Sequence, residues 1–167
     1  CIGPHASAQL KYWNNENGWQ KVVDYLLKIG YRVLYLSRED SGYMGNKNPT
    51  GIIQKSGELP IADRIGDLKY AELFIGVSSG LSWLAWAVDI PVVLIHGHNY
   101  SWYNFADKTK HINLENDDNV CTGCWHTDGF SPGDWNFCPK QKGTDREFEC
   151  TKKITPEMVI EGIKVML

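Results

Sequence analysis

The sequence has 167 residues, 43% of them hydrophobic, which suits one globular domain with a buried core. Seventeen Lys and Arg stand against 20 Asp and Glu, and the net charge of -3 argues against a nucleic-acid-binding role. No apolar run approaches the roughly 18 residues of a membrane span, and no signal peptide is visible, so we expect a soluble, cytoplasmic protein. Because the chain opens on Cys1 rather than Met, we treat it as part of a longer protein.

The first third of the chain shows one helical and one extended pattern. Apolar residues at helical spacing predict a helix over 15–29, and Gly30 follows as a stop signal. The short apolar run over 31–36 predicts a buried strand. Residues 41–57 are rich in Gly, Asn, Lys and Pro without a sustained period, which predicts a surface loop.

The alternation continues toward the C-terminus. The patterns predict a helix over 61–70, a strand over 73–77, a helix over 80–88, a strand over 91–95 and a weak strand over 111–114. This order predicts an α/β fold with a Rossmann-like, doubly wound parallel sheet. An irregular insertion, residues 115–153, comes next. Thr155-Pro156-Glu157 then supplies an N-cap, a first-turn proline and an acidic first turn for a final helix.

The junction between the strand over 73–77 and the next helix is a turn of small residues, Ser78, Ser79 and Gly80. A helix N-terminus offers unpaired N–H groups and the positive end of its dipole, so this turn can hold an anion. The hydroxyls, including that of Ser82, can donate to phosphate oxygens, and Gly80 permits close approach of the backbone. Ordinary capping of the helix by Ser79 explains the same residues equally well.

The loop after the strand over 91–95 carries His98, Asn99 and Ser101 among several aromatic residues. It follows the carboxyl end of a strand, where such sheets bind ligands. Asn99 or Ser101 could meet a ribose or a phosphate while an aromatic ring stacks on a base. A loop packed against another domain is the equal alternative.

Four of the five cysteines, Cys121, Cys124, Cys138 and Cys150, fall within the irregular insertion. The C-x2-C pair forms a knuckle that lets two thiolates meet one metal ion, and the other two complete a tetrahedral soft site. Zinc is the default ion and iron in a rubredoxin-like geometry is the alternative. With four protein ligands such an ion is structural.

Two other interpretations of the cysteines compete with a metal. Two disulfides would require an exported protein, for which no signal is visible. A redox C-x-x-C normally opens a helix after a strand, whereas Cys124 is followed by a loop-like sequence.

The turn and its flanks resemble the C-terminal nucleotide-sugar domain of the bacterial heptosyltransferase family. That family has a strand, then Asp-Ser-Gly-Pro-x-His-Leu-Ala-x-Ala, then a Pro-Val-Val strand. The residues that match this pattern are Ser79, Gly80, Leu84, Ala85 and Ala87. Ser78, Leu81 and Trp83 stand where the family has Asp, Pro and His.

A second stretch, which includes Ser7 and Lys11-Tyr12-Trp13, is similar to the Ser or Thr and Lys-x-Trp that this family places after the first strand. In the family the lysine contacts the phosphates of the donor. The resemblance therefore implies a donor site that includes Lys11, Ser7, and Ser78 through Ser82, to which we add His98 and Asn99. A solvated lysine is the alternative for Lys11.

Combined with the late cysteine cluster, these motifs resemble the bacterial autotransporter heptosyltransferases, which move heptose from ADP-heptose onto serines and hold iron in a finger. The resemblance implies that residues 1–167 form the donor domain of a GT-B fold, with 115–153 as a metal finger. It implies one structural iron, with zinc second, and a bacterial surface protein as acceptor. The acceptor domain and its acidic catalytic base would lie in an N-terminal half absent from this chain.

The rival class is a non-enzymatic protein-interaction module in which the finger grips a partner and the Rossmann-like part is a scaffold. Such a module would have no affinity for a nucleoside diphosphate. A zinc-ribbon nucleic-acid binder fits least, because the chain is acidic and lacks a basic stripe. A homo-oligomer is compatible with the sequence, which does not define the number of copies.

Overall fold

The computed structural model describes residues 1–39, 45–129, 131 and 133–167. Its centre is a six-stranded, wholly parallel sheet in the order β3-β2-β1-β4-β5-β6. The strands are β1 (Ile2–Gly3), β2 (Leu34–Leu36), β3 (Ile53–Lys55), β4 (Phe74–Val77), β5 (Val92–Ile95) and β6 (Thr109–Ile112). The predicted doubly wound α/β fold is confirmed.

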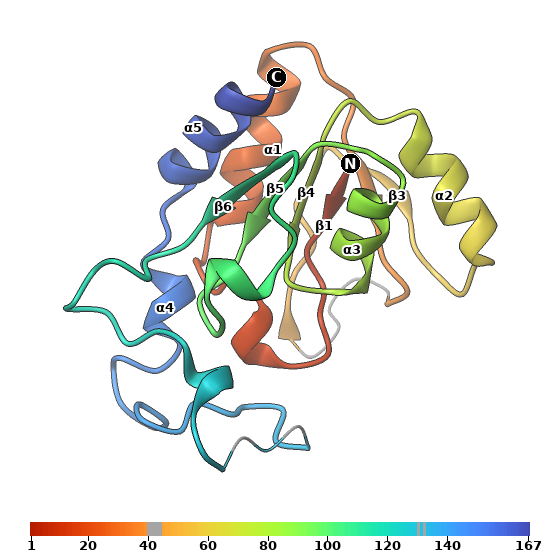
Figure 1. Cartoon of the computed structure of the whole chain (residues 1–167). Helices are drawn as coiled ribbons and strands as arrows, with labels where there is room; N and C mark the ends of the chain where they lie inside the picture. The colour runs from red at the N-terminus through yellow and green to blue at the C-terminus, as the bar shows by residue number, and fades with distance from the viewer. Residues whose placement is uncertain (40–44, 130, 132) are drawn as a thin grey trace.

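Helices cover both faces of this sheet (Figure 1). The α-helices are α1 (Gly18–Lys28), α2 (Ile61–Lys69), α3 (Gly80–Ala87), α4 (Glu149–Lys152) and α5 (Pro156–Met166). Short 3-10 turns in the described ranges include η1 (Gln9–Lys11), η3 (Ser101–Tyr103) and η4 (Cys124–His126). Helices α1 and α5 pack on one face, and α2 and α3 pack on the other. No helix within the described ranges is both long and apolar enough to cross a membrane.

The central strands are buried on both faces, which explains their unbroken apolar runs. In β5, Val93 and Ile95 join the core under α1 and α5, whereas Val92 and Leu94 join the core under α2 and α3. This alternation follows from the two-residue period of a strand. The apolar runs over 73–77 and 91–95 therefore predicted strands that the structure contains.

The last helix begins as its sequence signal predicts. The Thr155 hydroxyl accepts a hydrogen bond from the Met158 amide at 3.3 Å, and Pro156 occupies the first helical turn. Val159 and Ile163 then lie one turn apart in the core and are fully buried. Capping and periodicity thus agree on the start and the buried face of α5.

Three sequence predictions need correction. The segment 41–57, predicted as a surface loop, contains the edge strand β3, whose residues are all exposed, so no apolar period marks it; residues 41–44 lie outside the described residues. The weak strand predicted over 111–114 instead runs from Thr109 to Ile112. The irregular insertion includes α4, a helix of four residues that is too short for a periodic pattern to reveal.

Candidate functional site

A cleft of about 850 Å³ opens at the carboxyl ends of β1, β2 and β4. The strand order places β1 beside β4, where the order of successive strands reverses across the sheet, and ligands bind at such switch points. The loops after these strands and the start of α3 form its walls. Lining residues include His5, Ser7, Lys11, Glu39, Arg64, Ser79, Gly80, Leu81 and Trp135.

Lys11 brings an uncompensated positive charge to this cleft. Its ammonium donates to the Ser7 hydroxyl at 3.3 Å and lies 5.0 Å from the centre of the Trp125 ring. Burial lowers the pKa of Lys11, and no carboxylate of the described residues lies within ion-pair distance of it. A lysine held by a hydroxyl and an aromatic face keeps its charge available for an anion.

The turn before α3 lines the same cleft as Lys11. The Ser79 side chain makes no capping hydrogen bond, although its carbonyl accepts from the Ser82 amide at 3.1 Å. The Ser79 hydroxyl is buried and has no partner in the part of the chain that the structure describes. Gly80 leaves open space where a Cβ would stand. The turn therefore presents a helix N-terminus and an unused hydroxyl, which together suit a phosphate oxygen.

Four of the predicted donor residues do not line the cleft. Ser82 is fully buried and donates to the Val77 carbonyl at 2.6 Å, so its hydroxyl serves the strand-to-helix junction. Ser78 donates to the Asn104 side chain at 3.4 Å. His98 and Asn99 are each 2% exposed. The structure thus brings together Ser7, Lys11, Ser79, Gly80 and Leu81, whereas the other four lie outside the lining of the cleft.

His98 nevertheless affects the cleft through its charge state. Burial, followed by the charges of Lys11, His96 and His126, lowers the pKa of His98 to about 3. The imidazole is therefore neutral at physiological pH and adds no second cation beside Lys11.

The sequence analysis missed several cleft residues. Glu39 follows β2, the strand after which doubly wound dinucleotide-binding domains place an acidic residue against a ribose. Arg64 is 6% exposed and donates to the carbonyls of Ser37 at 2.6 Å and Gly57 at 2.8 Å, which joins the loops after β2 and β3. The sequence could have predicted Glu39, because the second strand of such domains is followed by an acidic residue. Trp135 carried no signal, because it comes from the distant insertion.

The cysteine-rich segment, residues 115–153, projects from the same edge of the sheet as the cleft loops (Figure 1). Its four cysteines all line one cavity of about 20 Å³, and each of them is a free thiol in the described structure. Gly123 has a φ of 72°, which shapes the knuckle between Cys121 and Cys124. As they stand, the described His, Cys, Asp and Glu side chains include no group of three that could hold a metal ion.

Burial disfavours ionisation of three of the thiols around this cavity. Burial raises the pKa of Cys124 to about 11, and it also raises the pKa values of Cys121 and Cys150. The Cys138 sulfur accepts a hydrogen bond from the Phe148 amide at 3.5 Å. Buried thiols of this kind ionise when a cation is adjacent, so the donor set fits a thiolate-bound metal chemically.

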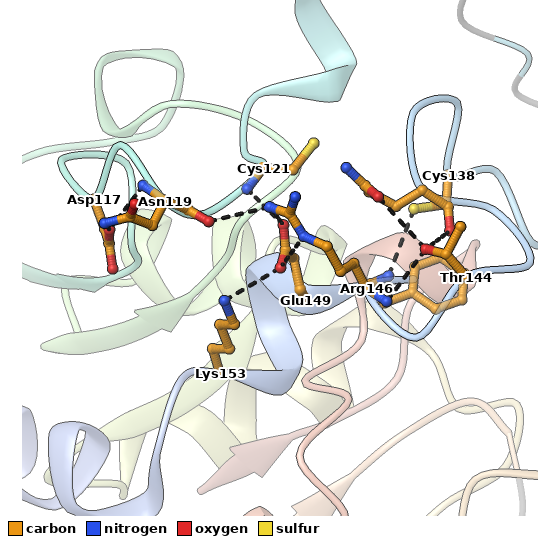
Figure 2. Close-up of polar contacts among 10 residues, drawn as sticks. Asp117, Asn119, Cys121, Cys138, Thr144, Arg146, Glu149 and Lys153 are labelled. Atoms are coloured by element: carbon orange, nitrogen blue, oxygen red, sulfur yellow. Dashed lines mark hydrogen bonds and ion pairs between the residues drawn. The ribbon is translucent and has the colours of Figure 1, made fainter.

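Glu149 ties the two ends of the cysteine-rich segment together (Figure 2). Its carboxylate accepts from the Cys121 amide at 2.9 Å, from Arg146 at 2.6 and 3.0 Å, and lies 3.3 Å from the Lys153 ammonium. The Arg146 hydrogen bonds hold the pKa of this carboxyl down to about 2. Because Glu149 is 4% exposed, these contacts act in a weakly screened environment and fix the start of the knuckle.

Comparison with known proteins adds to this geometry. The family model described as glycosyltransferase family 9 (heptosyltransferase) matches residues 1–124. Autotransporter heptosyltransferase Aah of Escherichia coli is 42% identical over 171 residues, an alignment that covers 99% of this chain and 43% of Aah. The chain therefore spans less than half the length of this relative.

Two solved structures from Escherichia coli share the fold. The first is dodecameric iron-containing heptosyltransferase TibC in complex with ADP-D-beta-D-heptose, with a TM-score of 0.89 and 40% identity over 99% of this chain and 44% of TibC. The second is ADP-heptose lps heptosyltransferase II, with a TM-score of 0.67 and 16% identity over 99% of this chain and 45% of that one. The second likeness concerns the fold alone.

Proposed function

The chain belongs to glycosyltransferase family 9, and from this premise we propose that it is the donor-binding half of a heptosyltransferase. The enzyme would transfer heptose from ADP-heptose to serine hydroxyls of an autotransporter-type surface protein. The name of Aah supports an autotransporter as the acceptor, and the complex of TibC with ADP-D-beta-D-heptose supports ADP-heptose as the donor. The observation that carries the proposal is the cleft itself, which is lined both by Lys11, whose ammonium has no carboxylate partner among the described residues, and by Ser79 and Gly80 at the N-terminus of α3.

Lys11 and the Ser79 turn bind the diphosphate of the donor. When the bond between the anomeric carbon and the phosphate oxygen breaks, negative charge grows on the departing ADP. A fixed cation and a helix N-terminus stabilise this charge more in the transition state than in the ground state. The neutral His98 adds no charge beside Lys11, and Ser7 holds the Lys11 ammonium at the cleft wall.

The transfer itself is a displacement at the anomeric carbon. The serine oxygen of the acceptor forms the new glycosidic bond, ADP leaves, and the serine proton passes to a base. We assign that base to the N-terminal half of the same enzyme, outside this chain. The half described here therefore binds and orients the donor and stabilises the leaving group.

We further propose that Cys121, Cys124, Cys138 and Cys150 hold one structural iron ion, with zinc as the alternative. All four line the same small cavity as free thiols, and TibC is described as iron-containing. A bound cation would ionise the thiols and cross-link a segment that has little regular structure. Iron–thiolate absorption in the visible spectrum and metal analysis of the purified protein would distinguish iron from zinc.

We also propose a cytoplasmic location and a homo-oligomeric assembly. The proposed metal site requires reduced cysteines, which supports the cytoplasm as the site of the reaction. TibC is dodecameric, which supports a homo-oligomer for this protein too.

Calorimetric titration of the full-length protein with ADP and with UDP tests the proposal. We expect preferential ADP binding that falls at least tenfold in Lys11→Ala, because a charge-assisted phosphate contact is lost. Lys28→Ala, which removes an equal charge from the exposed end of α1, is the control and should bind as the wild type does. If neither nucleotide binds, the non-enzymatic interaction module becomes the better explanation.

A further inference from the structure

The turn that carries Lys11 is built against the cysteine-rich segment. The Gln9 amide, in η1, donates to the Trp135 carbonyl at 2.9 Å. Ala8 and Leu10 share a small apolar core with Phe137 and Phe148 of that segment, against which Cys124 and Cys138 also pack. Leu10, which directly precedes Lys11, is therefore anchored in the same apolar cluster as Cys124 and Cys138.

The Lys11 side chain meets the same segment at its charged end. Its ammonium lies 5.0 Å from the centre of the Trp125 ring, and Trp125 follows Cys124 directly in the chain. The Trp125 amide donates to the His98 carbonyl at 2.7 Å, and the indole packs edge-to-face on the His98 ring at 5.6 Å between ring centres. His98 thus holds both the backbone and the ring of Trp125 in place.

An aromatic face suits a phosphate-binding lysine better than a carboxylate would. A lysine side chain loses considerable rotamer entropy when it is ordered. A partner that already holds the side chain in the free protein reduces the entropy that is lost when the ligand binds. A carboxylate in this place would order the ammonium and also cancel its charge. The indole attracts the ammonium through its quadrupole and leaves the charge available to the donor.

We propose that Trp125 is a positioning residue for donor binding, through which the cysteine-rich segment holds Lys11 ready for the diphosphate. Donor affinity then depends on the integrity of this segment, and donor binding in turn stabilises the segment, because such coupling is reciprocal. This inference rests on the function proposed above. It adds a task for the cysteine-rich segment, namely the construction of the donor site.

A double-mutant cycle on the full-length protein tests the inference. ADP affinity is measured by calorimetry for the wild type, Trp125→Leu, Lys11→Met and the double variant. We expect Trp125→Leu to weaken ADP binding about five- to tenfold, the range of a partly buried cation–π contact. In the Lys11→Met background the same change should alter affinity less than about twofold, because Trp125 acts through Lys11.

Conservative variants separate positioning from general damage. Trp125→Phe keeps a ring face and should bind ADP within about threefold of the wild type, whereas Trp125→Met keeps apolar volume without a ring and should behave as Trp125→Leu. Trp86→Leu, on α3 and away from the cleft, removes another half-exposed indole and should not change affinity. Thermal melting of every variant reports whether the fold is intact.

The outcomes distinguish this inference from the proposed function. If the wild type binds no nucleotide, the proposed function itself fails. If ADP binds and Lys11→Met weakens it while Trp125→Leu and Trp125→Met do not, only the role of Trp125 is refuted. An equal loss from Trp125→Leu in the wild-type and the Lys11→Met backgrounds would also overturn it, because the tryptophan would then act independently of the lysine.

Discussion

Arg64 is expected to be the main cross-link of the cleft wall formed by the loops after β2 and β3. The guanidinium is 6% exposed and donates to the carbonyls of Lys55, Ser37 and Gly57. A hydrogen bond from a charged donor contributes about 1.5–3 kcal/mol. Three such bonds are lost in Arg64→Met, and water entering from the open cleft recovers part of them, so we expect a loss of about 3–5 kcal/mol in the free energy of unfolding.

Urea denaturation followed by circular dichroism measures this loss. Arg64→Lys keeps the charge but not the planar fork, so it should lose about half as much as Arg64→Met. Arg38→Met is the matched control, because the Arg38 side chain is 74% exposed and its ion pair with Glu58 lies on the surface. That variant should lose less than about 1 kcal/mol. A loss below about 1 kcal/mol in Arg64→Met would refute the assigned role.

Three further predictions concern stability. Glu149→Gln should lower the free energy of unfolding by about 2 kcal/mol in urea denaturation, because it removes a buried carboxylate from between two cations; an unchanged midpoint would contradict this. Burial lowers the pKa of His96 to about 4, so on acidification the unfolded chain binds a proton before the folded chain does. The free energy of unfolding should therefore fall by on the order of 3 kcal/mol as the pH drops from about 7 to about 4. In His96→Gln the free energy of unfolding should depend less steeply on pH, as measured by urea denaturation at several pH values. Gly97→Ala places a Cβ 2.7 Å from the Cys150 carbonyl oxygen and should lower the melting temperature, whereas Gly66→Ala fills open space on α2 and should raise it; equal shifts would refute the steric argument.

The parts of the fold that the sequence predicts are those with an apolar period. β4 and β5 are buried on both faces, so their runs are continuous, and α5 has both a cap and a buried stripe. β3 was missed because an exposed edge strand needs no apolar residues and is held by backbone pairing to β2. Pairing between distant segments leaves no local pattern.

Some residues of the candidate site can likewise be predicted from the sequence, and others cannot. Ser79 lies in the turn directly after β4 and Lys11 in the longer connection that follows β1, so the topology of a parallel sheet brings them to one cleft. Burial of Ser82, His98 and Asn99 depends on how the loops pack, which spacing along the chain does not reveal. Trp125 and Trp135 reach the Lys11 turn from a distant part of the chain, and only the folded cysteine-rich segment places them there.

Transfer of the sugar to protein is the central claim, and intact-mass spectrometry tests it most directly. The full-length protein would be incubated with ADP-heptose and an autotransporter passenger domain, with released ADP quantified in parallel. We predict heptosyl additions on serines, one ADP released for each, and a rate about 100-fold lower in Lys11→Ala. An unmodified passenger under conditions where the wild type binds ADP-heptose, or a Lys11→Ala rate equal to that of the wild type, would contradict this account.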